Sequence, residues 1–389
     1  MSEPTLALYY QDDYAREMDA RLLEVRPDGL VLSQTVFYPR GGNQDCDRGT
    51  LTGRNSGDMS LNVEEVLKDE AGTITHRTVQ PAPPDWTPGL AVHGRLDWDR
   101  RLTLTRLHTA QHLISRWFLD HGDNGTTRVD ILETGCIIEL ARPITLEQAL
   151  DCEDDLNALI AAGRPVQRID TDGYLEIVVE AYDRQACGGT HVRDVSEIGH
   201  LAFTRVKGSR LELLCGPQAN VATRQMAAAT LGLLGPLETD LAGFAPRVQE
   251  LLQETAAQKA ALFALREEVA TARVARALET PHEVGGPEQT GLELYVVDLS
   301  MVESKALPRL LKPAQAPGRV FLCLCAGRNL VVVSGTSRLP AAAVVAALKT
   351  RYGLSGGGSP AVAQCGPLPA ATTLDEVLGV AAEVSAGGT

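Results

Sequence analysis

Two short pairs of histidine and cysteine residues place the strongest constraint on how this chain of 389 residues folds. The first pair, His108 and His112, lies in a stretch whose apolar residues recur at helical spacing. Four residues are slightly more than one helical turn, so both imidazoles leave the same helix face and can converge on one ion. Alone, this pair is weak evidence, because two surface histidines at this spacing also arise by chance.

The second pair, Cys187 and His191, encloses Gly188, Gly189 and Thr190. A thiolate and an imidazole at this spacing suit zinc, which accepts sulfur and nitrogen ligands in a tetrahedron. The two glycines disfavour a helix interior and predict a tight turn, with exposed backbone N–H groups for a carbonyl oxygen or an oxyanion. By itself the pattern also fits a plain turn with a buried cysteine.

Together the two pairs predict one zinc ion per chain, held by four side chains from the same domain. Ligand count leaves the role of that zinc open, because four protein ligands can also close a purely structural site. Catalysis requires an open or exchangeable position, at which zinc lowers the pKa of a bound water and polarises a carbonyl.

A third motif runs from Thr35 to Gln44 (TVFYPRGGNQ) and is followed by Asp47-Arg48-Gly49. Thr35 and Gln44 offer neutral hydrogen-bonding groups beside a strand and a glycine turn, which suits a small polar substrate. Without other evidence this segment is simply a strand that runs into a turn.

The composition indicates a soluble globular protein, with 44% hydrophobic and 22% charged residues. The N-terminal segment MSEPTLALYYQDDYAR lacks the features of a signal peptide, and no apolar run reaches the ~18 residues of a membrane span. We therefore expect a cytoplasmic protein with no membrane partner. Eight cysteines are too few for a disulfide scaffold, and Cys323 and Cys325 alternate as in a buried strand.

The net charge of -14 argues against general, non-specific binding of nucleic acids. An RNA partner would therefore have to meet a local basic patch. Three stretches are candidates, although a mixed solvated surface explains each of them equally well: 95–106, 205–210 and 305–319.

Four parts are expected along an α+β chain. Residues 1–85 read as a small, β-rich, barrel-like domain with a turn at Pro27-Asp28-Gly29, and the proline-rich segment 81–89 marks a connector. Residues 90–216 combine helical and strand patterns and form the α+β core that holds the predicted zinc site, including a helix over 146–162 that ends at Gly163.

Residues 217–280 carry apolar residues in a seven-residue register that Gly243 and Pro246 interrupt. A helical hairpin connector therefore fits better than one rod, and a homodimer through this region or through the C-terminal domain is an equal alternative. Residues 290–389 alternate strands and helices and predict a small α/β domain that contains a glycine-rich loop over 353–360.

These motifs occur together in one known family. HTAQHL, CGGTHV and TVFYPRGGNQDCDRG resemble, in order and approximate spacing, the editing domain of alanyl-tRNA synthetase and its freestanding relatives, the alanyl-tRNA editing proteins. The resemblance covers residues 5–216 and is specific, because three separated motifs agree. SGGGSPAVAQCG resembles the glycine-rich loop of the synthetase C-terminal domain. Nothing resembles the aminoacylation domain, so we expect a freestanding editing protein of the long form.

The resemblance implies a zinc-dependent deacylase that hydrolyses serine, with glycine also possible, from mischarged alanine tRNA in trans. The implied roles are zinc ligation by His108, His112, Cys187 and His191; catalytic or pocket-lining positions at Thr35, Gln44 and Gln111; substrate binding by Gly188, Gly189, Thr190 and Asn43; and tRNA binding by Gly356, Gly357 and Gly358.

Asn43 departs from the family pattern, in which glycine commonly precedes the glutamine. Asparagine tolerates left-handed backbone geometry, so the turn can persist while a side chain is added to the pocket. Two alternatives remain open at this point. The protein could edit another mischarged tRNA, such as serine-charged threonine tRNA, since threonyl-tRNA synthetase editing domains resemble this zinc core. Alternatively, it could be a non-catalytic tRNA-binding protein in which zinc only staples the fold.

Overall fold

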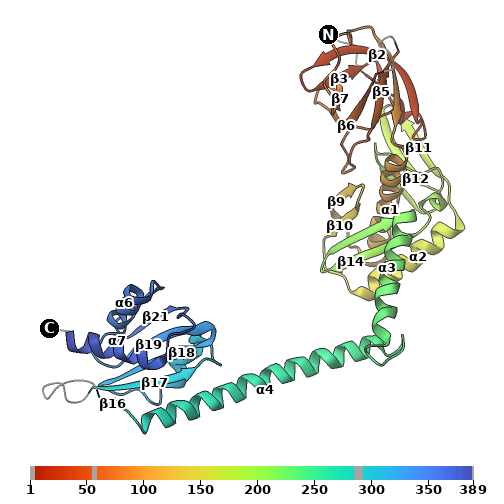
Figure 1. Cartoon of the computed structure of the whole chain (residues 1–389). Helices are drawn as coiled ribbons and strands as arrows, with labels where there is room; N and C mark the ends of the chain where they lie inside the picture. Colours follow the sequence, from red (N-terminus) through yellow and green to blue (C-terminus); the bar gives the residue numbers. More distant parts are fainter. Residues whose placement is uncertain (1–4, 55–58, 284–291, 388–389) are drawn as a thin grey trace. The chain divides into compact units, whose positions relative to one another are not determined.

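The N-terminal segment closes into a six-stranded barrel in the order β2-β3-β7-β6-β5-β8. The computed structural model describes residues 5–54, 59–283 and 292–387 (Figure 1). The barrel strands are β2 (Glu17–Arg26), β3 (Gly29–Leu32), β5 (Gly49–Gly53), β6 (Ser60–Lys68), β7 (Ile74–Thr78) and β8 (Ala91–Leu96). Buried and exposed residues alternate along β2 and β6, which turns one face of each strand into the barrel core.

The barrel confirms the predicted β-rich N-terminal domain, and its closing strand extends it beyond residue 85. Strand β8 follows the proline-rich segment 81–89 and pairs with both β2 and β5. Outside the barrel, the short strands β1 (Leu6–Ala7) and β4 (Gln34–Thr35) pair in parallel. The 3-10 helix η1 (Leu8–Tyr10) directly follows β1.

An α+β core follows, built from two long helices and two antiparallel sheets. Helix α1 (Trp98–Gly122) starts at Asp97, whose side chain accepts from the backbone N–H of Arg100. Helix α2 (Leu146–Ala162) has a capping box formed by Thr145 and Gln148, and it ends at Gly163 as predicted.

The first sheet of the core has the order β14-β15-β10-β9 and the second has the order β11-β12-β13. Their bounds are β9 (Thr126–Leu132), β10 (Gly135–Leu140), β11 (Val166–Thr171), β12 (Tyr174–Val179), β13 (Asp183–Ala186), β14 (Leu201–Lys207) and β15 (Arg210–Cys215), with the 3-10 helix η2 (Val195–Ile198) between β13 and β14. Apolar residues of α1, α2 and the first sheet share one buried cluster. The burial of α1 on this cluster places the His108 and His112 side chains inside the molecule.

The chain divides into two compact units, residues 1–236 and residues 237–389. Helix α3 (Gly216–Leu234) belongs to the first unit and α4 (Phe244–Leu278) to the second. The predicted interruption of the helical connector is confirmed at residues 235–243. Pro246 lies in the first turn of α4, where its missing N–H removes no intrahelical hydrogen bond. Packing of the two helices as a hairpin and dimerisation through them stay predictions.

The second unit contains a six-stranded mixed sheet in the order β16-β17-β18-β19-β21-β20, which confirms the predicted small α/β domain. Its strands are β16 (His282–Glu283), β17 (Glu293–Leu299), β18 (Arg319–Cys325), β19 (Asn329–Ser334), β20 (Ser355–Gly358) and β21 (Val362–Gly366). Its remaining helices are η3 (Ser304–Ala306), α5 (Leu307–Leu311), η4 (Ala326–Arg328), α6 (Ala341–Tyr352) and α7 (Leu374–Gly387). Cys323 and Cys325 are buried in β18 as free thiols, as their alternation predicted.

The glycine-rich segment was expected to form a loop, and this expectation is wrong. Residues 355–358 form the edge strand β20, which pairs with β21. A Cβ atom at Gly356 would lie 2.2 Å from the carbonyl oxygen of Gln364, and Gly356 has φ +154°. The glycine therefore allows a close approach of two backbones that a side chain would prevent. None of the helices within the described ranges has the length and apolar character needed to cross a membrane.

Candidate metal centre

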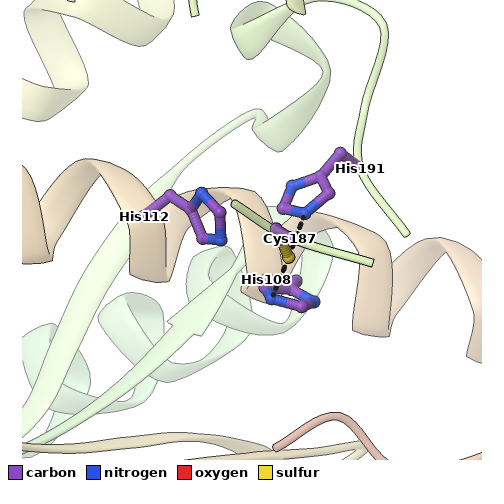
Figure 2. Close-up of side chains that lie close together, drawn as sticks. All are labelled: His108, His112, Cys187 and His191. Carbon is purple, nitrogen blue, oxygen red and sulfur yellow. Dashed lines mark hydrogen bonds between the residues drawn. The ribbon is translucent and has the colours of Figure 1, made fainter. Parts of the chain in front are cut away.

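Helix α1 and the loop that follows β13 bring the two predicted ligand pairs together (Figure 2). The potential ligand atoms of His108, His112, Cys187 and His191 all lie within 4.8 Å of one another. Cys187 Sγ is 3.4 Å from His108 Nε2 and 3.3 Å from His191 Nε2. Zinc bonds of about 2.0–2.3 Å in a tetrahedron separate neighbouring ligand atoms by roughly 3.3–3.8 Å, so the two distances from Cys187 Sγ fit a tetrahedral zinc ion.

Hydrogen bonds orient two of the three imidazoles. His108 Nδ1 donates to the side-chain oxygen Oε1 of Gln44 at 2.7 Å. His191 Nδ1 lies 3.2 Å from the hydroxyl of Thr109, which itself donates to the carbonyl of Thr105 and so accepts from the imidazole. Because each Nδ1 carries the proton, each Nε2 presents its lone pair towards Cys187, which is the arrangement that a metal requires.

His112 has a carboxylate rather than a direct hydrogen-bond partner beside it. Its Nδ1 lies 3.8 Å from Asp183 Oδ2. Asp183 in turn accepts from Gln185, and burial raises the pKa of the Asp183 carboxyl. The three histidines therefore differ in their outer partners, which are an amide, a hydroxyl and a carboxylate.

Burial keeps the three imidazoles neutral. It lowers the pKa of His112 to about 4 and lowers the pKa values of His108 and His191 well below their ordinary range. Neutral imidazole is the form that ligates a metal. Burial also raises the pKa of the Cys187 thiol, so a thiolate at this position needs a neighbouring cation to be favourable. The donor set, its spacing and its electrostatics all fit a zinc ion.

The loop between Cys187 and His191 packs directly on the first ligand. A Cβ atom at Gly189 would lie 2.1 and 2.3 Å from atoms of the His108 ring, whereas one at Gly188 would meet only the Tyr10 hydroxyl region at 3.6 Å. The backbone N–H groups of this turn were expected to be exposed. Instead, that of Gly189 donates to Cys187 Sγ and that of Thr190 to Gln44 Oε1, so both serve the site itself.

Gln44 reaches the site from the loop between β4 and the barrel strand β5. Its side chain is 1% exposed, and its Nε2 donates to Thr190 Oγ1 at 2.9 Å, while Thr105 on α1 contacts the same hydroxyl at 2.9 Å. Asn43, directly before it, has φ 63° and accepts from the backbone N–H of Ile131. The asparagine thus occupies the left-handed conformation that was expected, and its side chain is exposed.

Two consecutive arginines fasten this loop to helix α1. Arg101 forms a fully buried ion pair with Asp47, to which its Nε donates at 3.0 Å, and Arg100 contacts Asp45 at 2.6 Å. Asp45 and Asp47 come shortly after Gln44 in the chain. Their ion pairs with α1 therefore hold Gln44 over the helix face that carries His108 and His112. Removal of one partner of a buried ion pair strongly destabilises the fold, because it leaves an uncompensated buried charge.

The other predicted site residues lie at different distances from this cluster. Gln111 lies on α1 between the two histidines, is 9% exposed and donates to Ser115 Oγ. Thr35 lies in the first unit's barrel region, where its hydroxyl is 2.7 Å from His76 Nε2 and accepts from the N–H of Phe37. Glycines 356–358 belong to the second unit. The roles of these residues stay predictions.

Arg168 on β11 is a site residue that the sequence did not reveal. Its Nη2 donates to the carbonyl of Gly189 at 2.6 Å and to Asp13 Oδ1 at 2.7 Å. The guanidinium thus joins the N-terminal segment, β11 and the metal-binding loop, which are three stretches without a shared local signal. Thr105 and Thr109 were also missed, although helical spacing places them on the face that carries His108 and His112.

The structure corrects the interpretation of the first candidate basic patch. Arg100 and Arg101, at the centre of 95–106, are buried and paired with carboxylates. In the other two stretches the ion pairs include Arg205 and Arg210 with Glu212, Lys305 with Glu303, Arg309 with Glu267 and Arg319 with Glu293. These basic side chains therefore have acidic partners nearby, although the pairs are exposed and contribute little individually.

Comparison with known proteins supports the family resemblance. Residues 171–213 match the family model described as the threonyl and alanyl tRNA synthetase second additional domain. The chain is 34% identical over 210 residues to the alanyl-tRNA editing protein AlaX-M of Pyrococcus horikoshii, an alignment that covers 52% of this chain and 91% of that protein.

Two further relatives match larger shares of this chain. The chain is 27% identical over 292 residues to alanyl-tRNA editing protein AlaX-L of the same organism, covering 67% of this chain and 70% of the relative. It is 26% identical to the alanine–tRNA ligase of Methanoregula boonei, over 98% of this chain and 43% of the ligase. The chain therefore spans less than half the length of that ligase.

The clustering of the two predicted ligand pairs, the predicted barrel and α+β core, and the extent of the AlaX-M alignment all agree with the family resemblance. The chain belongs to the alanyl-tRNA editing protein family and corresponds to its long form.

Proposed function

We propose that this protein hydrolyses the ester bond of mischarged alanine tRNA, releasing serine, with glycine as a second substrate. The observation that carries the proposal is the cluster of three buried histidines and the partly buried Cys187, whose potential ligand atoms lie within 4.8 Å of one another, in a chain whose relative AlaX-M is named an alanyl-tRNA editing protein. An aminoacyl ester is already reactive, so positioning of the ester and modest activation of water suffice for its hydrolysis.

The four ligands would hold one zinc ion, which when bound supplies a Lewis acid for the ester or for water. Around it, the protein's own residues provide orientation. Gln44 and Thr109 fix the tautomers of His108 and His191, and Arg168 holds the carbonyl of Gly189 so that the Cys187–His191 turn keeps its shape. This rigid support favours a fixed substrate position, which is the main contribution that a site with four protein ligands can make.

Substrate selection is proposed to rest on small polar groups beside the cluster. We assign Gln44, Gln111 and Thr35 to the catalytic pocket, and Asn43, Gly188, Gly189 and Thr190 to substrate binding. A site that hydrogen-bonds the serine hydroxyl disfavours alanine, because alanine would leave buried polar groups unpaired. Glycines 356–358 are proposed to contact the tRNA, and residues 217–280 or the C-terminal domain to form a homodimer.

Purified full-length protein tests the proposal. It is incubated with alanine tRNA charged with serine, glycine or alanine, and with serine-charged threonine tRNA. We expect rapid loss of serine and slower loss of glycine from alanine tRNA, with alanine retained. Preferential hydrolysis of the threonine tRNA would favour the related editing activity instead, and no hydrolysis of any substrate would exclude a deacylase.

The His108→Ala variant and metal removal test the role of zinc. Both changes are expected to abolish hydrolysis, with zinc content measured directly on each protein. If chelation unfolds the protein, the metal stabilises the fold as well, so circular dichroism accompanies each assay. Full hydrolysis by a zinc-free His108→Ala protein would contradict the proposed metal centre.

A further inference from the structure

Four planar side chains form a continuous row on the surface of the first unit. The guanidinium of Arg16 lies 4.1 Å from the ring centroid of Trp98, the Trp98 and Tyr14 rings are 5.4 Å apart, and the guanidinium of Arg193 lies 4.3 Å from the Tyr14 ring. These residues come from three separate segments: the approach to β2, the start of α1 and the stretch after the metal-binding loop. We call them the stacking row.

The stacking row leads towards the metal cluster. Tyr14 and Arg193 line a cavity of about 370 Å³ whose wall also includes Asp12, Asp13, Arg168 and the candidate metal ligand His191. This volume lies within the range of about 300–1,000 Å³ that is usual for ligand sites. Two members of the row therefore line a space that also borders the proposed reaction site.

The two ends of the row are exposed and the aromatic rings between them are partly exposed. The Arg193 side chain is 63% exposed and contacts Asp12, which is itself 49% exposed. An exposed ion pair of this kind contributes little to stability, so a phosphate oxygen can take the place of the Asp12 carboxylate. Although the chain is acidic overall, exposed arginine side chains lie against aromatic rings here: Arg16 against Trp98 and Arg193 against Tyr14.

We infer that the stacking row binds the unpaired 3′ end of an RNA substrate and guides it into the cavity beside His191. Unpaired bases stack on aromatic rings and on arginine planes, while guanidinium groups bind the phosphates between them. The row consists of two aromatic rings and two guanidinium groups. Such groups stack on unpaired bases, so the row fits a single strand better than a duplex, whose bases are already stacked on one another. This inference rests on the proposed function, because it specifies how that substrate enters the site.

The test compares the binding of two RNAs to the full-length protein. The first is uncharged alanine tRNA, and the second is the same tRNA after removal of its unpaired 3′ nucleotides. Fluorescence anisotropy should show that the wild-type protein binds the intact tRNA at least about tenfold more tightly, because even one stacked base accounts for a preference of this size. Trp98→Ala, Tyr14→Ala and Arg193→Gln should each reduce this preference to less than about threefold.

Matched variants separate stacking from folding. Tyr14→Phe keeps the ring but loses the hydrogen bond to Glu197, and it should retain the preference for intact tRNA. Tyr174→Ala and Arg128→Gln change an exposed tyrosine and an exposed arginine elsewhere in the first unit, and they should also retain it. Unchanged preference in the Trp98 and Tyr14 alanine variants, or equal loss in Tyr14→Phe and Tyr14→Ala, would overturn the inference.

Separate measurements of hydrolysis and of binding on the wild-type protein distinguish this inference from the proposed function. A wild-type protein that hydrolyses no charged tRNA but shows the row-dependent preference would refute the deacylase alone. A protein that hydrolyses serine-charged tRNA but binds intact and shortened tRNA equally would refute the stacking row alone.

Discussion

Gln44, on the loop that leaves the barrel, accepts a hydrogen bond of 2.7 Å from His108 on helix α1. Its side-chain nitrogen donates to Thr190 in the second metal-binding motif. One amide therefore links all three sequence motifs, and it sets the tautomer of a candidate metal ligand from a different part of the fold.

Replacement of Gln44 tests this link. In Gln44→Ala, the Nδ1 of His108 loses its acceptor, so the imidazole is no longer held in the tautomer that binds metal. We expect zinc affinity to fall by about 10- to 100-fold, as is usual when an outer partner of a ligating histidine is removed. Competition with a chromophoric chelator measures the affinity. Gln34→Ala, which removes an exposed glutamine contact in the barrel region, serves as the control, and an equal affinity in both variants would contradict the assignment.

Two adjacent glycines should respond differently to the same substitution. Gly189→Ala places a methyl group 2.1 Å from an atom of the His108 ring, so the ring or the loop must move. We expect loss of bound zinc and destabilisation by about 1–3 kcal/mol, as for overpacked cores. Gly188→Ala meets its nearest atom at 3.6 Å and should retain zinc. Metal analysis and thermal unfolding check both variants. Retention of zinc by Gly189→Ala would show that the packing of this loop is not required.

The buried ion pair between Arg101 and Asp47 should matter far more than an exposed one. Both side chains are 0% exposed, and Asp47→Ala would leave the guanidinium without its carboxylate. We expect the free energy of unfolding of the first unit to fall by about 3–5 kcal/mol. Asp130→Ala, which breaks an exposed pair with Arg128, should cost less than about 1 kcal/mol. Urea unfolding measures the free energy of unfolding of both variants. Similar decreases in the two would show that the buried ion pair at Asp47 has no special importance for stability.

His76 should make the stability of the barrel depend on pH. Burial lowers the pKa of His76 in the folded protein to about 4, whereas the unfolded value is about 6.5. The unfolded chain therefore takes up a proton first as pH falls, and stability that is complete above pH 6.5 decreases by up to about 3 kcal/mol by pH 4. His76→Gln should show a correspondingly smaller loss between pH 7 and pH 4.5. Parallel pH profiles of the two proteins would refute this contribution.

The glycines of β20 separate a structural role from a binding role. Gly356→Ala would place a methyl group 2.2 Å from a carbonyl oxygen of β21, so we expect it to disrupt the sheet edge. Gly357→Ala meets no atom within 4 Å and should leave the stability of the second unit unchanged. Thermal unfolding measures the first effect and tRNA affinity the second. Weaker tRNA binding by a fully stable Gly357→Ala protein would support the proposed tRNA contact.

Local sequence determined much of the fold and which four side chains form the candidate metal site. Helix α1, the capped helix α2 and the buried strand β18 follow from apolar spacing and from terminal signals such as Gly163, which act within a few residues. His108 and His112 share a helix face for the same reason. The glycine-rich edge strand β20 was missed, because its strand conformation depends on the backbone of β21 rather than on its own residues.

Only the tertiary structure decided how the site is completed and supported. Gln44, from the loop between β4 and β5, accepts the hydrogen bond of His108, and Asp47 forms a buried ion pair with Arg101. Arg168 donates both to Asp13 and to the carbonyl of Gly189 in the Cys187–His191 turn. The stacking row likewise assembles from three distant segments. Such contacts carry no periodic signal, because burial and side-chain geometry select each partner across a long stretch of chain. The sequence thus identified the candidate metal ligands, and the packing of the barrel against the core determined their orientation.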